Sequence, residues 1–165
     1  MSTAAVVVAS NRAASGVYSD TTGPLLVEAL RAWGFETPDP VVVPDGRPVG
    51  EAVADAVRSE VAVVLTTGGT GINPTDRTPD VVAPLLDREL PGVAEAIRAH
   101  GIAQGVPTAA LSRGVAGVAG RTLVVTVPGS RGGVKDALAV LADLVPHAVD
   151  QLAGGDHARA PEPPA

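Results

Sequence analysis

Apolar residues along this 165-residue chain fall into two patterns, which predict strands and helices in turn. Continuous apolar runs, typical of strands covered on both faces, predict strands at 4–9, 41–43 and 61–66. Apolar residues three or four positions apart predict helices between Asp20 and Gly34 and over 49–60, 79–90, 91–100 and about 130–152. An antiparallel hairpin is predicted from 114–118 and 122–127. A polar loop is expected at 11–19, and 107–113 fits either a helical turn or a loop.

This alternation of strands and helices predicts a three-layer α/β/α fold, with a mostly parallel sheet and one antiparallel hairpin. A chain of this length is long enough to bury a substantial core as one domain. We expect that domain to span residues 1–153, and we expect the proline-rich residues 154–165 to form a disordered tail.

The loops that follow the predicted strands are the first place to look for a site. In parallel sheets, ligands bind outside the carboxyl ends of the strands. Each of these loops is rich in glycine, hydroxyl or charged residues. They begin at Ser10, Pro44, Thr67 and Pro128. If the strands are parallel neighbours, the four loops converge.

One of these loops, Thr67-Gly68-Gly69-Thr70-Gly71, is followed by Asp76 and by a helix that begins at Pro79. Backbone amides of a glycine turn can approach a phosphate closely, because no Cβ blocks them and the next helix end carries partial positive charge. A carboxylate such as that of Asp76 can hold the Mg²⁺ that accompanies a di- or triphosphate. The segment therefore predicts an anion and nucleotide site.

Three familiar motifs do not fit the chain. A Walker A loop requires a lysine after its second glycine, and none follows this glycine turn. The dinucleotide fingerprint accommodates Gly69 and Gly71 but meets Pro74 where its third glycine belongs. A nucleophile elbow requires glycine at the position of Pro128.

Composition and charge narrow the function classes. The formal net charge is −6, and Lys135 is the only lysine among twelve basic residues, which argues against a nucleic-acid surface. The absence of cysteine excludes disulfides and thiolate metal sites, and His100, His147 and His157 lack metal-ligand spacing. No apolar run approaches membrane-spanning length, and no basic region precedes the first strand. We therefore expect a soluble, cytoplasmic protein without a membrane partner.

Seven short segments, in matching order over about residues 4–150, carry a family resemblance. They are Ser10-Asn11-Arg12, Ser15-Gly16-Val17-Tyr18, Asp20 with Thr22-Gly23-Pro24, Thr66 to Gly71, Asp76 to Asp80, Leu111-Ser112-Arg113 and Val127 to Ser130. On these segments the chain resembles the MoaB/Mog family of molybdenum cofactor biosynthesis. The segment Ser15–Tyr18 is more similar to the Mog branch, which adenylylates molybdopterin.

The resemblance implies a nucleotidyl transfer in which the terminal phosphate of molybdopterin attacks the α-phosphorus of MgATP and pyrophosphate leaves. Such a reaction requires alignment and neutralisation of charge rather than a strong base. It also implies a homotrimer, with a molybdenum insertase as a candidate partner. A protein that binds molybdopterin without catalysis, or a nucleotide-binding regulator, is an alternative.

The resemblance also assigns roles to individual residues. Asp45 and Asp76 are the expected catalytic residues and the expected ligands of Mg²⁺. The expected substrate- and nucleotide-binding residues are Arg12, Thr67, Gly68, Gly69, Thr70, Gly71, Ser112, Arg113, Pro128, Gly129 and Ser130.

Several of these residues have a purely structural alternative. Asp76 and Ser130 each precede a predicted helix and are suitable N-caps. Asp45 lies in Pro-Asp-Gly, an ordinary turn sequence. Arg12 and Arg113 are compatible with plain surface charges. Asp20 is expected to be a helix cap or an interface residue.

Overall fold

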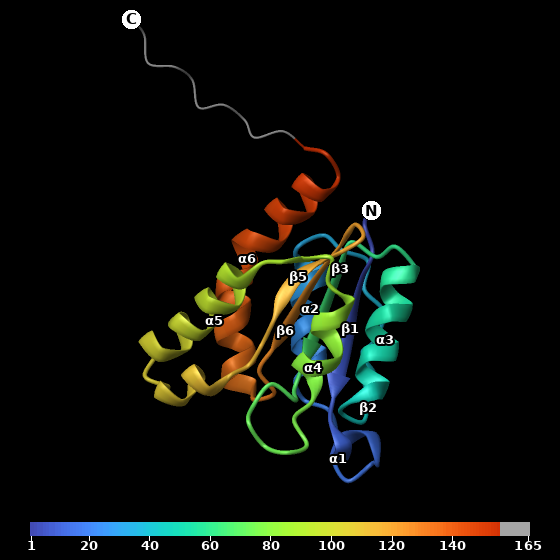
Figure 1. Ribbon diagram of the computed structural model, residues 1–165. Helices are drawn as coiled ribbons and strands as arrows, with labels where there is room; N and C mark the ends of the chain where they lie inside the picture. The colour runs from blue at the N-terminus through green and yellow to red at the C-terminus, as the bar shows by residue number, and fades with distance from the viewer. Residues whose placement is uncertain (156–165) are drawn as a thin grey trace, which may run out of the picture.

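The computed structural model describes residues 1–155 and contains one six-stranded sheet (Figure 1). The strands are β1 (Ala4–Ala9), β2 (Val41–Val43), β3 (Val63–Thr67), β4 (Arg88–Glu89), β5 (Ala116–Ala119) and β6 (Thr122–Val127). Their order across the sheet is β2-β1-β3-β6-β5-β4. The first four strands in that order are mutually parallel, and β5 pairs antiparallel with both β6 and β4. Parallel central strands are covered on both faces, which explains their unbroken apolar runs.

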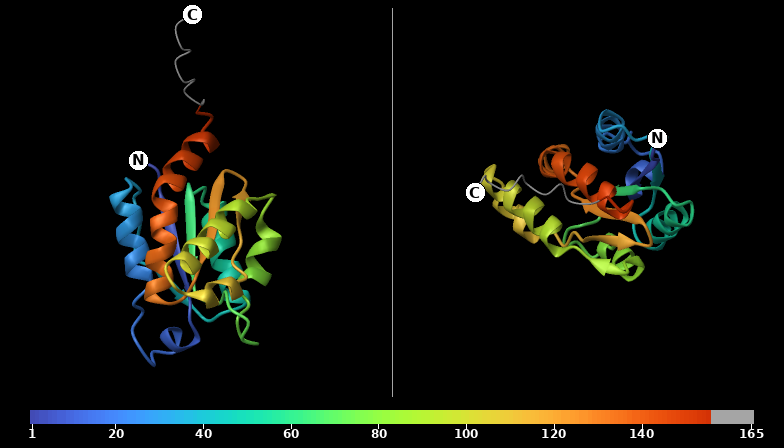
Figure 2. Two further views of the ribbon diagram at one scale, coloured as in Figure 1. Left: turned by 90° about the vertical axis from the view of Figure 1, so that its left-hand side faces the viewer. Right: turned by 90° about the horizontal axis from the view of Figure 1, so that it is seen from above.

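Helices cover both faces of the sheet (Figure 2). They are α1 (Asn11–Ala14), α2 (Gly23–Ala32), α3 (Arg47–Arg58), α4 (Thr78–Val82), α5 (Pro91–Ala103) and α6 (Arg131–Leu152), with 3-10 helices η1 (Ala83–Leu85) and η2 (Pro107–Leu111). On one face, buried residues of α2, α5 and α6 pack against the sheet. Examples are Leu30, Ile97 and Leu141. On the other face, α3 and α4 pack against the sheet through buried residues such as Val49 and Val82. The predicted three-layer α/β/α fold with a mostly parallel sheet is confirmed.

Two local expectations were wrong. The helix expected over 79–90 ends early, because Pro84 lacks an N–H donor and Leu86 is extended. Residues 88–89 then form β4, which pairs with β5. The loop expected at 11–19 contains α1, whose N-cap Ser10 accepts a hydrogen bond from the Ala13 amide (3.1 Å).

The predicted end of the domain stays a prediction. The last helix, α6, ends at Leu152, close to the boundary expected at 153. The tail expected at 154–165 lies outside the described residues from position 156 onward. No helix among residues 1–155 combines the length and the apolarity needed to cross a bilayer.

Two buried threonines that pair in register, Thr66 on β3 and Thr126 on β6, differ in their hydrogen bonds. The Thr66 hydroxyl is the one buried side-chain polar atom in residues 1–155 that lacks a partner. The Thr126 hydroxyl accepts a hydrogen bond from the Val115 amide (2.8 Å) and donates to the Val115 carbonyl (3.0 Å). An unpaired buried hydroxyl is unfavourable, so valine is better suited to position 66 than to position 126.

We therefore expect Thr66→Val to raise the free energy of unfolding by about 1 kcal/mol, because it removes an unpaired polar group at constant shape. Its matched control, Thr126→Val, is expected to lower that free energy by about 1–3 kcal/mol, because the Val115 amide loses its acceptor. Urea unfolding of the two variants measures both. A loss of stability in Thr66→Val would contradict the assignment of Thr66 as unpaired.

Candidate functional site

The predicted convergence of the strand-end loops is confirmed by the sheet. Strands β2, β1, β3 and β6 are adjacent and parallel, so their carboxyl ends lie along one edge. The loops after these strands contain α1, the Asp45 turn, the glycine turn and Pro128–Ser130. The candidate site lies where they meet.

At the centre of this edge, the backbones at the end of β1, in the glycine turn and in the loop after β6 approach one another closely. Gly68 has φ +93°, and a Cβ there would overlap the carbonyl oxygen of Ala9 at the end of β1. A Cβ on Gly129 would lie 3.0 Å from Gly68 Cα. The Thr67 hydroxyl donates to the Pro128 carbonyl (2.8 Å), which ties β3 to the loop after β6. Only glycine permits this approach at position 68.

The amides of the glycine turn are unequally available. Gly68 N donates to the Val127 carbonyl (3.2 Å), so it is engaged within the protein. Among the hydrogen bonds of residues 1–155, none has the amide of Gly69, Thr70 or Gly71 as its donor. These three successive amides are therefore not engaged within residues 1–155, and their binding of an anion stays a prediction.

A cavity of about 320 Å³ opens beside this turn. It is lined by the ends of β1 and β3, by residues of the 10–22 loop and by Gly129. Tyr18 and Asp20 belong to its wall. Asp20 accepts hydrogen bonds from the amides of Thr22, the N-cap of α2, and of Gly23, the first residue of that helix (3.0 Å each), so it binds the start of the helix without being its N-cap.

Arg12 does not line this cavity but supports its wall. Arg12 Nη1 donates to the Tyr18 hydroxyl (2.7 Å), and its guanidinium carbon lies 5.5 Å from the centre of the Tyr18 ring. Cation–π attraction and the hydrogen bond together hold the tyrosine. In this structure Arg12 braces Tyr18, and its predicted role in substrate binding stays a prediction.

A second cavity of about 420 Å³ lies on the other side of the Pro128–Ser130 loop, between α5, η2 and the start of α6. Ser112, Pro128 and Ser130 line it, together with Arg98 and Lys135. Ser130 is also the N-cap of α6, since its hydroxyl accepts from the Gly133 amide (3.0 Å). Six of the predicted binding residues thus divide between two cavities that share one loop, whereas Arg12, Gly69, Thr70, Gly71 and Arg113 line neither. Arg98 and Lys135 were missed, because a cation on a helix surface carries no motif signal.

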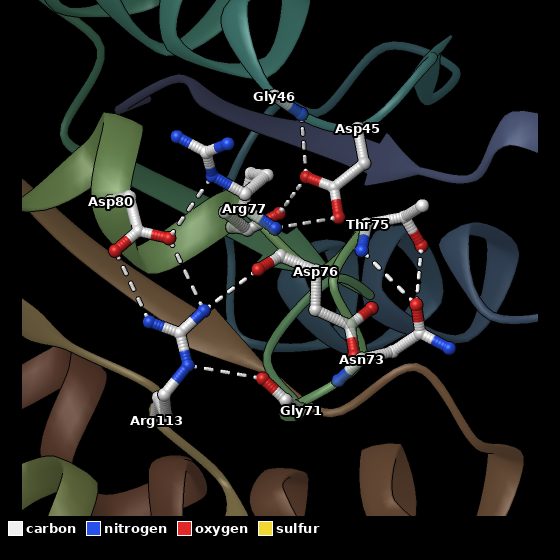
Figure 3. Close-up of polar contacts among 10 residues, drawn as sticks. Asp45, Gly46, Gly71, Asn73, Thr75, Asp76, Arg77, Asp80 and Arg113 are labelled. Atoms are coloured by element: carbon white, nitrogen blue, oxygen red, sulfur yellow. Dashed lines mark hydrogen bonds and ion pairs between the residues drawn. The ribbon is translucent and has the colours of Figure 1, made fainter.

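The Asp45 carboxylate joins two loops (Figure 3). It accepts hydrogen bonds from the Gly46 amide (2.6 Å), the Arg77 amide (3.1 Å) and the Thr78 hydroxyl (3.0 Å). The Asp45 amide in turn donates to the Asn11 side chain (3.0 Å). Asp45 therefore connects the ends of β1, β2 and β3, which is more than the turn role alone.

Asp76 is less engaged than Asp45. Its Oδ2 accepts from the Asn73 amide (3.1 Å), and its Oδ1 has no hydrogen-bond partner among residues 1–155. The helix that follows begins at Thr78, with Arg77 as its N-cap. The alternative that Asp76 caps this helix is therefore not supported, and one carboxylate oxygen is available to a ligand.

Arg113 contacts the loop that carries Asp76 rather than either cavity (Figure 3). Its guanidinium donates to the carbonyls of Gly71 (3.0 Å) and Asp76 (2.7 Å) and to both carboxylate oxygens of Asp80 (3.1 and 3.2 Å). The hydrogen bond from Arg113 lowers the pKa of the Asp80 carboxyl below its ordinary value. Asp80 was missed as a site residue, although it lies within the segment Asp76–Asp80.

Neither His100 nor His147 takes part in this edge. His100 on α5 lies 4.0 Å from Asp136, and His147 on α6 contacts Gln151. Neither lines either cavity, and His157 lies outside the described residues. Among residues 1–155 no group of three or more His, Cys, Asp or Glu side chains is placed to hold a metal by itself.

Comparisons with known proteins agree with the sequence resemblance. Residues 5–147 match the family model described as "Probable molybdopterin binding domain". A molybdenum cofactor biosynthesis bifunctional protein of Chlorobaculum tepidum is 38% identical over 155 residues, which cover 93% of this chain. The match covers 49% of that relative, so the chain spans about half its length.

Two further relatives match over most of their length. A molybdopterin adenylyltransferase of Helicobacter pylori is 32% identical over 156 residues, covering 90% of this chain and 86% of that protein. The structure of a molybdopterin biosynthesis Mog protein from Mycobacterium ulcerans has a TM-score of 0.88 and 54% identity, covering 92% of this chain and 99% of that one.

Proposed function

The chain belongs to the MoaB/Mog family of molybdenum cofactor biosynthesis, and we propose that it is a molybdopterin adenylyltransferase. The proposed reaction transfers AMP from MgATP to the terminal phosphate of molybdopterin. One observation carries this proposal. A turn with three available amides lies between a cavity and an aspartate with an available oxygen, on an edge with a second cavity beyond Pro128–Ser130.

This arrangement suits a reaction between two phosphate-bearing molecules. A terminal phosphate oxygen of molybdopterin forms a bond to the α-phosphorus of ATP, and the bond from that phosphorus to the β-phosphate oxygen breaks. The attacking phosphate is anionic at neutral pH, so no strong base is required. The amides of Gly69, Thr70 and Gly71 would neutralise charge on the phosphates. The two cavities would align the substrates across their shared loop.

Mg²⁺ fits this edge as a companion of the triphosphate. The ion is commonly bound by one or two carboxylates together with substrate phosphates and water, so a cluster of three protein ligands is not needed. Asp76 offers an oxygen without a hydrogen bond, whereas the oxygens of Asp45 accept three hydrogen bonds. We therefore propose Asp76 as the main protein ligand and Asp45 as a secondary one. When bound, the ion would neutralise negative charge on the transferred and leaving phosphates.

Product analysis tests the proposal. The full chain is incubated with molybdopterin and MgATP, and adenylylated molybdopterin and pyrophosphate are detected by mass spectrometry. An ATP analogue with a methylene bridge between the α- and β-phosphates is the control, because it cannot release pyrophosphate. Binding of molybdopterin without AMP transfer would favour the non-catalytic alternative. Tight ATP binding without any pterin dependence would favour a nucleotide-binding regulator.

We also propose a homotrimer, with a molybdenum insertase as a candidate partner. Beyond the resemblance, three large apolar side chains are exposed around α5 and η2, namely Ile102 (47% exposed), Val106 (45%) and Leu111 (52%). A second copy would cover such a surface. We expect light scattering at micromolar concentration to give about three times the chain mass of 16.4 kDa. A clean monomer mass would contradict the trimer.

A further inference from the structure

The loop that carries Asp76 is exposed, and its conformation has to be maintained against solvent. Within the loop, Asn73 organises a compact turn. Its carbonyl accepts from the Asp76 amide (2.8 Å), and its side chain accepts from the Thr75 amide (3.0 Å) and hydroxyl (2.9 Å). These contacts shape the turn but do not fix its place relative to the sheet.

Arg113 supplies that attachment from a distant part of the chain. Its guanidinium reaches the carbonyls of Gly71 and Asp76, which stand at the two ends of segment 71–76. Its own amide donates to the carbonyl of Thr70 (2.7 Å), immediately before the segment. Three carbonyls of one loop thus converge on one residue, and Figure 3 shows the two that the guanidinium reaches, those of Gly71 and Asp76.

Asp80 fixes the orientation of the Arg113 guanidinium. Both carboxylate oxygens of Asp80 accept from Arg113, and Oδ2 also lies 3.5 Å from Arg77 Nε. Since Asp80 lies in α4, the pair connects the loop, the start of that helix and the segment before β5. A bidentate arginine–carboxylate pair is directional, and lysine cannot reproduce it.

The contacts of Arg113 argue against a direct role in binding phosphate. Among the described contacts, four of its five N–H groups are engaged, two with backbone carbonyls and two with Asp80. A phosphate ligand would have to displace them.

We propose that Arg113 and Asp80 form a latch that positions Asp76, and that neither side chain touches substrate. The latch holds segment 71–76 so that the Asp76 carboxylate and the amides of the glycine turn keep one arrangement. This inference rests on the proposed function for what Asp76 does, but the attachment of the loop can be measured without any substrate.

The first experiment is amide hydrogen exchange on the full chain without ligands, comparing Arg113→Lys with the unmutated protein. We expect the amides of Asp76 and Thr78 to exchange at least about tenfold faster in the variant, because lysine keeps the positive charge but cannot form the bidentate contacts of the guanidinium. The matched control is Arg58→Gln, which removes an exposed arginine paired with Asp55 on α3. It should leave exchange in segment 70–78 unchanged. Unchanged exchange in Arg113→Lys would overturn the latch.

The second experiment separates positioning from substrate binding. In Arg113→Lys we expect kcat for AMP transfer to fall about tenfold, the Mg²⁺ requirement to rise and KM for ATP to stay within about twofold. If Arg113 bound phosphate directly, Arg113→Lys would keep most of the turnover of the unmutated protein, and Arg113→Gln would show its defect as a raised KM for ATP. That result would overturn the proposal.

The third experiment tests the partner. Asp80→Asn should accelerate exchange of the same amides, and the double variant Asp80→Asn/Arg113→Lys should add little, because the two residues act as a unit. Additive effects would overturn the pairing. If the unmutated protein transfers no AMP at all, the proposed function fails, whereas the exchange experiments still decide on the latch.

Discussion

An Asp76→Asn protein is expected to keep its fold and to transfer AMP at least about tenfold more slowly, on the scale of losing one electrostatic contact in a charged transition state. Asparagine retains a side-chain oxygen to accept from the Asn73 amide, so the turn should survive. What it lacks is the negative charge shared with Oδ1, the oxygen that has no hydrogen-bond partner among residues 1–155. The loss should therefore appear in turnover and in the dependence on Mg²⁺, not in the free energy of unfolding.

Initial rates of AMP transfer across a Mg²⁺ titration, with urea unfolding in parallel, measure both quantities. Asp87→Asn is the matched control. Asp87 also accepts from one backbone amide, that of Gly120 (2.6 Å), but it lies near the hairpin turn at the opposite end of β6. Its replacement should leave turnover unchanged. A destabilised Asp76→Asn protein with normal activity in its folded fraction would establish a purely structural role for Asp76.

Asp45→Asn should behave differently, because its carboxylate holds the Arg77 amide and the Thr78 hydroxyl next to Asp76. Loss of the Asp45 carboxylate therefore disturbs the loop that carries Asp76. Asp76→Asn, by contrast, leaves this loop in place and removes only the charge of one side chain. The double variant should therefore lose less activity than the product of the two single losses. If Asp45→Asn matches the unmutated protein at every Mg²⁺ concentration, Asp45 is a turn residue and only Asp76 is left as a proposed ligand of Mg²⁺.

The sequence predicted the site edge because of a property that parallel strands share. Each strand that ends at this edge is followed by a loop rich in glycine or polar residues, and parallel neighbours bring such loops together without any knowledge of side-chain contacts. The sequence also predicted the glycine turn, but as an approach for a phosphate. The structure adds a second reason for glycine, because only a residue without Cβ lets Gly68 approach Ala9.

Roles that depend on partners far along the chain were not predictable. Arg113 and Asp80 are 33 residues apart, and no periodicity links them. The adjacent residues Ser112 and Arg113 were predicted to bind substrate together, yet Ser112 lines the second cavity while Arg113 faces the Asp76 loop. Two adjacent residues of one motif thus contribute to two different parts of the molecule, and only the tertiary fold shows this division.

The early end of the helix expected over 79–90 has a similar cause. Apolar spacing in this stretch fits a helix, but Pro84 interrupts its hydrogen bonds, and β5 offers a pairing partner for residues 88–89. Local sequence propensity does not include this pairing with β5, because β5 lies in another part of the chain.

Gly68→Ala is expected to have the largest effect on stability. Gly68 and Gly34 share φ +93°, a conformation that costs an L-residue roughly 1–2 kcal/mol. At Gly34 a Cβ would meet no atom within 4 Å, so Gly34→Ala measures that backbone term alone. At Gly68 a Cβ would overlap the Ala9 carbonyl, which is backbone at the end of a central strand and has no rotamer to change.

We therefore expect Gly68→Ala to lower the free energy of unfolding by about 2–5 kcal/mol, because overpacking adds to the backbone term. The folded fraction should also lose AMP transfer at least about tenfold, since relief of the overlap moves the turn that we propose to bind phosphate. Urea unfolding and initial rates on Gly68→Ala and Gly34→Ala make the comparison. Equal losses of stability in the two variants would show that β1 and the turn are not in contact at this point. Glycine would then be required at position 68 only for its positive φ, and not for a close approach between the turn and the end of β1.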